Sequence, residues 1–101
     1  DNETTVGWYE NLNDWTRGHV NKYFGITDNK EINWRFIRVA LSSVADTVII
    51  PMQDYLGLGN EARINTPSSF GKNWEWRMKK DACTQELAAK MKELTIIYGR
   101  L

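Results

Sequence analysis

The numbers of cysteine and histidine residues limit the kinds of metal site and catalytic site that this sequence can form. Its 101 residues include one cysteine, Cys83, and one histidine, His19. A single cysteine forms no internal disulfide, and the two residues together are too few for a structural zinc site or a cysteine–histidine catalytic pair. Any chemistry must therefore rest on carboxylates, amides, hydroxyls and aromatic rings, and we expect no metal or other cofactor.

Carboxylate and amide side chains are the remaining candidates, and each has a structural alternative. Asp1 alone is a terminal acid, while Asn65 precedes Thr66-Pro67, where turn chemistry explains an asparagine equally well. Asp54 suits either the cap of a short helix or an ion pair with Arg63. The candidates are Asp1, Asn2, Gln53, Asp54 and Asn65.

Aromatic residues and charge point to a particular class of partner. Five tryptophans in so short a chain require a large core or a surface that faces carbohydrate or another protein. Trp74 and Trp76 suit sugar stacking, but their alternation is more typical of a packed extended segment. Thirteen basic and thirteen acidic residues give a net charge of zero, which argues against nucleic acid or an anionic membrane as the partner. With no apolar run near the roughly 20 residues of a membrane span, and no signal peptide, we expect a cytoplasmic protein.

Four helices are expected where apolar residues recur at helical spacing behind a capping side chain. Gly25 and Gly99 suit the left-handed turn that follows a helix C-terminus. The third helix has the strongest apolar stripe, which includes Ile37 and Leu41. The expected helices run from Thr4 to Tyr9, from Asp14 to Phe24 behind Asn13, from Trp34 to Ala45 behind Asn33, and from Leu87 to Tyr98 behind Thr84.

One segment predicts a strand rather than a helix. Thr47-Val48-Ile49-Ile50 is β-branched throughout and predicts a fully buried parallel strand that ends near Pro51. Such a strand needs hydrogen-bonded neighbours on both sides, yet residues 53–83 contain no second one and instead favour a long loop. The sequence also begins at Asp1 without an initiator methionine. We therefore expect residues 1–101 to be a single unit that is less than one complete domain.

Several separated motifs carry a specific resemblance. They are DNETTVGWY at the start, LSSVADTVIIP in the middle, then PMQDYLGLGNEARINTP, GKNWEWRM and a closing YGR. In this order they resemble the C-terminal region of the 4-alpha-glucanotransferase family, the amylomaltases or disproportionating enzymes. The resemblance implies that residues 1–101 form the C-terminal quarter of a (β/α)₈ barrel of the alpha-amylase type, an α/β fold that is mostly helical in this fragment. A complete barrel takes about 250 residues.

The resemblance also implies a reaction and its partners. Such enzymes transfer α-1,4-glucan segments from a maltooligosaccharide donor to an acceptor with retention, using a nucleophile and an acid/base about 5 to 5.5 Å apart. Both carboxylates come from earlier strands, so the remainder of the barrel is a required partner. Asp1 matches the third catalytic acid, which holds sugar hydroxyls at the cleavage subsite. Asn2, Gln53, Asp54 and Asn65 are the implied substrate-binding residues, with Asn65 on the acceptor side.

Two other classes of function remain open at this point. A non-catalytic carbohydrate-binding module would suit the tryptophan content and neutral charge, but it needs a sandwich of many strands. A helical interaction module would suit a chain that is about half amphipathic helix. The sequence alone favours the enzyme because its motifs occur in order along the whole chain.

Overall fold

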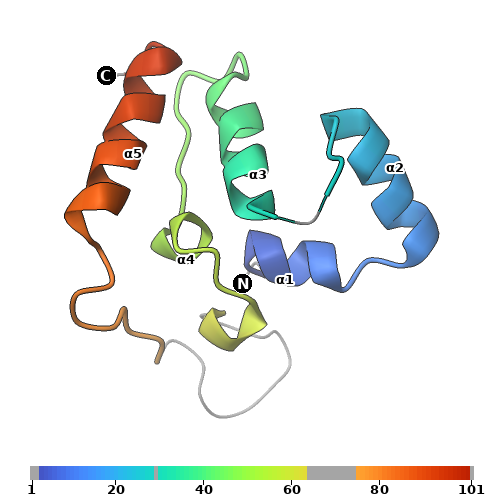
Figure 1. Ribbon diagram of the computed structural model, residues 1–101, viewed down its shortest axis with the longest axis horizontal. Helices are drawn as coiled ribbons and strands as arrows, with labels where there is room; N and C mark the ends of the chain where they lie inside the picture. The colour runs from blue at the N-terminus through green and yellow to red at the C-terminus, as the bar shows by residue number, and fades with distance from the viewer. Residues whose placement is uncertain (1–2, 29, 64–74, 101) are drawn as a thin grey trace.

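The computed structural model describes residues 3–28, 30–63 and 75–100 as an array of helices (Figure 1). Helices α3 and α5 flank the extended segment that leads from α3 to α4, α4 lies below in this view, and α1 and α2 extend to the right. The elements are α1 (Thr5–Glu10), α2 (Asp14–Phe24), α3 (Ile32–Leu41), α4 (Met52–Tyr55), the 3₁₀ turn η1 (Asn60–Ala62) and α5 (Gln85–Ile97).

The predicted caps of three helices are confirmed. The Thr4 hydroxyl accepts from the Gly7 N–H at 3.1 Å, and the Asn13 amide oxygen accepts from the Thr16 N–H at 2.8 Å. The Thr84 hydroxyl accepts from the Leu87 N–H at 3.1 Å in α5. Each bond satisfies one N–H group that the first turn of a helix leaves without a backbone partner.

The predicted cap and end of α3 are wrong. This helix begins one residue before Asn33, behind Glu31, which adopts a left-handed conformation and makes no side-chain capping bond. Asn33 is buried, and its Nδ2 donates to the backbone oxygen of Asp54 at 2.8 Å. The helix ends at Leu41 rather than Ala45, and Val44 is fully exposed. The Asn33 side chain, which the local sequence pattern predicts to be a helix cap, instead makes a tertiary hydrogen bond to α4.

The apolar core lies between α3 and α5. Ile37 and Leu41 of α3 and Leu94 of α5 are buried there, as the helical spacing predicts. Removal of these side chains from water is the main contribution to the packing of α5 on α3. The partly buried side chains packed against them are Trp34, Val48, Ile50, Tyr55 and Tyr98.

The predicted buried strand at residues 47–50 is not a strand. This segment runs extended beside the α3–α5 core (Figure 1), and none of the described residues is in a strand. Val48 and Ile50 are half-buried against the core, but Ile49 points outward and is 86% exposed. The alternation follows from extended geometry, which turns successive side chains to opposite faces. A strand also needs a backbone partner, and the described residues supply none.

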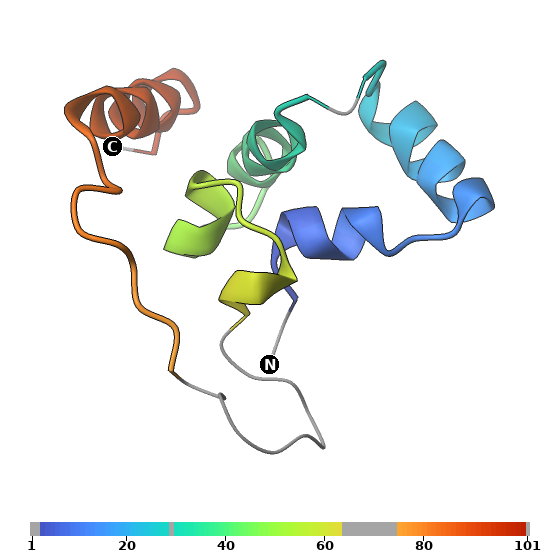
Figure 2. The same ribbon diagram turned by 60° about the horizontal axis from the view of Figure 1, so that its bottom comes forward.

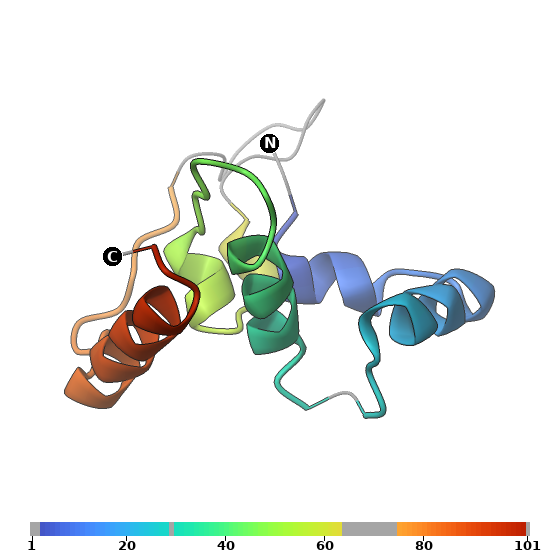
Figure 3. The same ribbon diagram turned by 90° about the horizontal axis from the view of Figure 1, so that it is seen from above.

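A second apolar cluster fixes α1 on α3. The ring of Phe36 in α3 makes edge contacts with Trp8 and Tyr9 of α1, at centroid distances of 5.9 and 6.4 Å. Phe24, at the end of α2, meets the same ring at 4.9 Å. Figures 2 and 3 show α1 starting next to α3 and running away from it, with α2 beyond the far end of α1. The cluster therefore positions the N-terminal segment relative to the core.

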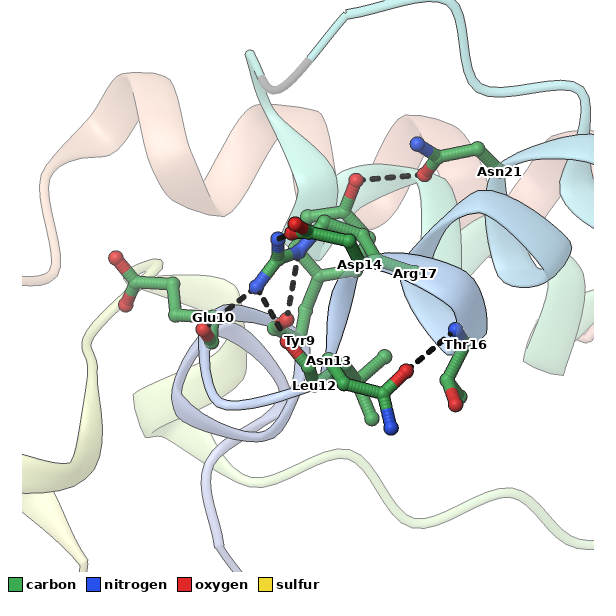
Figure 4. Close-up of polar contacts among 8 residues, drawn as sticks. All are labelled: Tyr9, Glu10, Leu12, Asn13, Asp14, Thr16, Arg17 and Asn21. Carbon is green, nitrogen blue, oxygen red and sulfur yellow. Dashed lines mark hydrogen bonds and ion pairs between the residues drawn. The ribbon is translucent and has the colours of Figure 1, made fainter.

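Arg17 joins α1 to α2 by binding the backbone at the end of α1 (Figure 4). Its Nη2 donates to the backbone oxygens of Glu10 and Leu12 at 2.8 and 2.7 Å, and its Nε donates to that of Tyr9 at 3.4 Å. The hydroxyl of Tyr9 donates to the Asn21 amide oxygen in α2 at 2.6 Å. The guanidinium thus satisfies carbonyls that the helix end leaves open.

Arg100 plays the corresponding part at the end of α3. Its Nε donates to the Leu41 oxygen at 2.8 Å and its Nη2 to the Ser43 oxygen at 3.0 Å. Its Nη1 donates to the Asp46 oxygen at 3.4 Å. The arginine of the YGR motif therefore closes α3 and ties the C-terminal segment to the turn that leads into residues 47–50.

We expect Arg100→Lys to loosen the end of α3, because an ammonium group cannot reproduce the planar fork of donors. Loss of one to two hydrogen bonds should cost about 1 to 2 kcal/mol. Amide hydrogen exchange on the full-length protein that contains this chain should show roughly tenfold faster exchange in the last turn of α3. Arg77→Lys is the matched control, since Arg77 is exposed and bonds the adjacent Trp76 oxygen. Equal exchange in both variants would contradict this role.

Candidate functional site

Two motifs that are about 50 residues apart in the sequence meet in space. The start of α1 lies beside α4 and η1, so residues 3–7 of the opening motif contact residues 53–63 of the central one. The views in Figures 1 and 2 both place the start of α1 close to η1. This meeting point is the candidate functional site.

Asp54 connects α4 to the first turn of α1. One carboxylate oxygen, Oδ1, accepts from the backbone N–H of Thr5 at 2.7 Å. A carboxylate at a helix N-terminus is favourable because it satisfies an unpaired N–H and interacts well with the helix dipole. The bond agrees with the predicted role of Asp54 as a cap of a short helix, although the helix is α1 and not the one that contains Asp54.

Gln53 holds η1 against α4. It is 7% exposed, and its Nε2 donates to the backbone oxygen of Ala62 at 3.3 Å. Ala62 itself is fully buried. An amide buried without partners would be costly, so this bond fixes how the central motif folds back on itself.

An ion pair joins the ends of the two motifs. Arg63 Nη1 lies 3.6 Å from Glu3 Oε1, and the two side chains are only 17% and 31% exposed. Coulomb attraction between charges is stronger where water is partly excluded than on an open surface. Arg63 also takes part in a further interaction. The pair therefore tethers Glu3, which lies just before α1, to the end of η1.

Gly7 allows η1 to approach α1 closely. A Cβ atom at this position would lie 2.2 Å from Asn60 Oδ1 and 2.4 Å from its Cγ. Gly7 is buried, and Asn60 Oδ1 is a buried oxygen without a hydrogen-bond partner in the described structure. Gly7 is therefore needed because the Asn60 side chain occupies the space of a Cβ atom, and not because the backbone at Gly7 has an unusual conformation.

Tyr55 borders the site on the side of the core. Its ring packs against Trp34 at a centroid distance of 5.8 Å. Burial raises the pKa of the Tyr55 phenol, because the anion would lose solvation. The phenol therefore stays neutral at physiological pH, and its position supports the packing of α4 on α3.

Comparison with known proteins decides which family these motifs represent. The family model described as 4-alpha-glucanotransferase matches residues 1–84. The chain belongs to the 4-alpha-glucanotransferase family. The resemblance of the motifs is confirmed, and the central motif lies wholly inside the matched range.

Relatives in this 4-alpha-glucanotransferase family are much longer than the chain. The 4-alpha-glucanotransferase of Clostridium butyricum is 48% identical over 101 residues, which are 99% of this chain and 21% of that protein. The chloroplastic/amyloplastic enzyme of Oryza sativa subsp. japonica is 44% identical over 104 residues, covering 100% of this chain and 18% of that protein. The chain spans about a fifth of the length of these relatives.

A solved structure from the family has the same arrangement of elements. The amylomaltase from Streptococcus agalactiae in complex with acarbose superposes with a TM-score of 0.92 at 37% identity. The match covers 99% of this chain and 20% of that one. The mostly helical fold is thereby confirmed as part of an amylomaltase structure.

The structure describes some of the residues that the sequence predicts for the glucanotransferase site and leaves others outside the described ranges. Asp54 hydrogen-bonds the opening motif at Thr5, and Gln53 hydrogen-bonds Ala62 within the central motif. The roles of both residues toward substrate stay predictions. Trp76 is half-buried, and His19 lies in α2, as expected, stacked on Trp15 at 6.0 Å. The predicted residues that lie outside the described residues are Asp1, Asn2, Asn65 and Trp74.

The residues of the site that were not singled out from the sequence include Glu3, Gly7 and Asn60. All three lie inside the motifs that carry the resemblance, which was the available signal. Their pairing depends on contact between segments that are far apart in the sequence, which local spacing does not reveal.

The described residues contain no group of three or more acidic, histidine or cysteine side chains that could hold a metal ion. None of the helices in the described ranges combines the length and apolar character that a membrane span requires.

Proposed function

We propose that this chain is part of an enzyme that transfers α-1,4-glucan segments between maltooligosaccharides by a retaining double displacement. The match of the family model over residues 1–84 is the observation that carries this proposal. We further propose that residues 1–101 form the C-terminal quarter of a catalytic (β/α)₈ barrel. A cytoplasmic location remains an expectation from the sequence.

Within this proposal the chain supplies the transition-state contacts rather than the nucleophile. The nucleophile and acid/base belong to parts of the barrel outside residues 1–101. Asp1 accepts hydrogen bonds from two vicinal hydroxyls of the sugar at the cleavage subsite and so stabilises the positive charge that develops on the ring. Asn2 also binds substrate, and Asn65 binds the acceptor sugar.

Gln53 and Asp54 are candidates for sugar contacts at the end of the segment 47–50. Barrel enzymes place site residues directly after strands, which is where these two stand if residues 48–51 pair in the complete barrel. The packing bonds described above occupy the Nε2 group of Gln53 and one carboxylate oxygen of Asp54. Each side chain has a second polar atom that suits a sugar hydroxyl.

The product pattern from maltotriose tests the proposal. A full-length protein that contains this chain should convert maltotriose into glucose and oligosaccharides longer than maltotriose, as judged by chromatography. The 101-residue chain alone should convert none, because two of the three required carboxylates are absent from it. Hydrolysis to glucose and maltose without longer products would contradict a transferase. Disproportionation by the isolated chain would contradict the placement of the nucleophile and acid/base.

A further inference from the structure

An open groove lies on the outer face of α2, and its volume is about 300 Å³. Arg17 and Asn21 bind α1 from the inner face of the same helix (Figure 4). Trp15 and His19 stand two positions before them, and two positions turn a helix by about 200°, so these two side chains lie on the opposite face. The residues that line the groove are Asp14, Trp15, Gly18, His19 and Lys22.

Trp15 supplies the groove with an open aromatic surface. It is 80% exposed, although tryptophan is among the most costly side chains to leave in water. The ring of His19 lies nearly parallel to the indole, with the ring planes 7° apart and the centroids 6.0 Å apart. A neighbour stacked in this way restricts the rotation of the indole, so less conformational entropy is lost when a ligand binds to it.

Gly18 keeps the space beside this ring open. On a helix, a side chain leans toward the residues three and four positions before it, so a side chain at position 18 would extend over Asp14 and Trp15. A Cβ atom at Gly18 would meet nothing within 4 Å, which means that packing does not require a glycine here. The helix bears the usual cost of an internal glycine, about 1 kcal/mol, and gains an uncovered indole face.

The charges at the rim of the groove favour a neutral, hydroxyl-rich ligand. Asp14 and Lys22 are both exposed and carry opposite charges, so the pair as a whole attracts neither an anion nor a cation. A carboxylate accepts hydrogen bonds and an ammonium group donates them. An indole face packs well against the C–H groups of a pyranose ring, because its π system is electron-rich. A sugar offers both kinds of contact.

We propose that the groove on α2 binds an α-1,4-glucan chain, with Trp15 stacked on one sugar unit. This inference rests on the proposed function, which makes long glucans the carbohydrate that the protein meets. The groove lies apart from the candidate functional site, since α2 follows the end of α1 and that site adjoins its start. A long chain held in the groove has a raised effective concentration near the protein, whereas maltotriose is too short to profit from a second contact.

The test uses Trp15→Ala in the full-length protein that contains this chain. We expect the KM for amylose to rise about threefold to tenfold and retention in an amylose-containing gel to fall. The kcat and KM for maltotriose should equal those of the wild type. Trp15→Tyr keeps a flat ring and should recover most of the affinity for amylose.

Gly18→Leu is a second variant that does not remove the tryptophan. It fills the space beside the indole, so the KM for amylose should rise as it does for Trp15→Ala. The urea midpoint of unfolding should not fall, because the new Cβ meets no neighbour and leucine favours a helix more than glycine does.

Tyr23→Ala is the matched control for an exposed aromatic side chain. Tyr23 lies on the same helix and is 77% exposed, but it does not line the groove, and its ring contacts Phe24 at a centroid distance of 5.1 Å. We expect its KM for amylose and its retention to equal those of the wild type. Equal weakening by Tyr23→Ala and Trp15→Ala would overturn a specific site in the groove.

The outcomes separate this inference from the proposed function. A wild type that disproportionates maltotriose, with unchanged amylose KM and retention in Trp15→Ala and Gly18→Leu, would overturn the groove alone. So would a lowered urea midpoint of Trp15→Ala with unchanged retention, since the remainder of the protein would then cover Trp15. A wild type that does not disproportionate maltotriose would overturn the proposed function, while amylose retention that Trp15→Ala and Gly18→Leu both abolish would still support the groove.

Discussion

Replacing Asp1 with Asn in the full-length protein is expected to lower kcat by about 10² to 10³, with little change in apparent substrate affinity. The amide keeps the size of the side chain but removes its charge and one acceptor. Hydrogen bonds to the sugar should strengthen as the ring flattens and becomes positive, so the loss falls on the transition state more than on bound substrate. Loss of such a preorganised group typically costs about 2.7–4 kcal/mol. Initial rates of glucose release from maltotriose measure the effect.

Asn65→Ala provides the contrasting result. Because Asn65 is assigned to the acceptor side, its loss should raise the acceptor concentration needed for half-maximal transfer and leave formation of the covalent intermediate unchanged. Near-normal turnover by Asp1→Asn would show that the match of this residue to the family's third acid is wrong. An Asn65→Ala variant with lower kcat and unchanged acceptor dependence would contradict the acceptor assignment.

Gly7→Ala is expected to destabilise the protein by about 1 to 3 kcal/mol, the usual cost of forcing an extra methyl group into a packed interior. The new Cβ would lie 2.2 Å from Asn60 Oδ1, so the Asn60 side chain must leave its place between α1 and η1. This cost opposes the gain of about 1 kcal/mol that alanine normally brings to a helix. The urea midpoint of the full-length protein measures the balance.

Gly18→Ala is the matched control for Gly7→Ala. Gly18 also lies in a helix, α2, but a Cβ there meets nothing within 4 Å. This substitution should therefore stabilise the protein by up to about 1 kcal/mol. Asn60→Ala removes the blocking group, so the double variant Gly7→Ala/Asn60→Ala should be more stable than the sum of the single effects predicts. Stabilisation by Gly7→Ala equal to that by Gly18→Ala would contradict close packing at this point.

Helix positions could be predicted from the sequence because the relevant signals are local. Thr4, Asn13 and Thr84 cap helices through bonds to residues three positions ahead, and Gly25 adopts the left-handed conformation that ends α2. The start of α3 could not be predicted in this way. Asn33 looks like a cap in the local pattern, but its amide bonds α4, 21 residues further on. A tertiary contact there outweighs the local preference.

The segment 47–50 shows a different limit of sequence reasoning. Its β-branched residues correctly indicate extended backbone, and Val48 and Ile50 do pack against the core. Pairing in a sheet depends on other segments, and the described residues provide no partner backbone. The 86% exposure of Ile49 is consistent with a face that has no neighbour in the described structure.

The candidate site could be predicted only as a set of motifs. Asp54 was recognisable as a residue with a role, but its bond to Thr5 spans 49 positions and has no local signature. The same holds for the Glu3–Arg63 pair and for the close approach of Asn60 to Gly7. Motifs identify the residues, while the fold decides which of them meet.

The most direct measurement of the central claim follows where a transferred glucan goes. The full-length protein is incubated with maltotriose and ¹³C-labelled glucose, and the products are examined by NMR. The proposed retaining transfer predicts that the label enters the reducing end of oligosaccharides joined by new α-1,4 linkages. Label that remains in free glucose while maltotriose is consumed, or label in β-linked products, would contradict the assignment of this chain to a retaining glucan transferase.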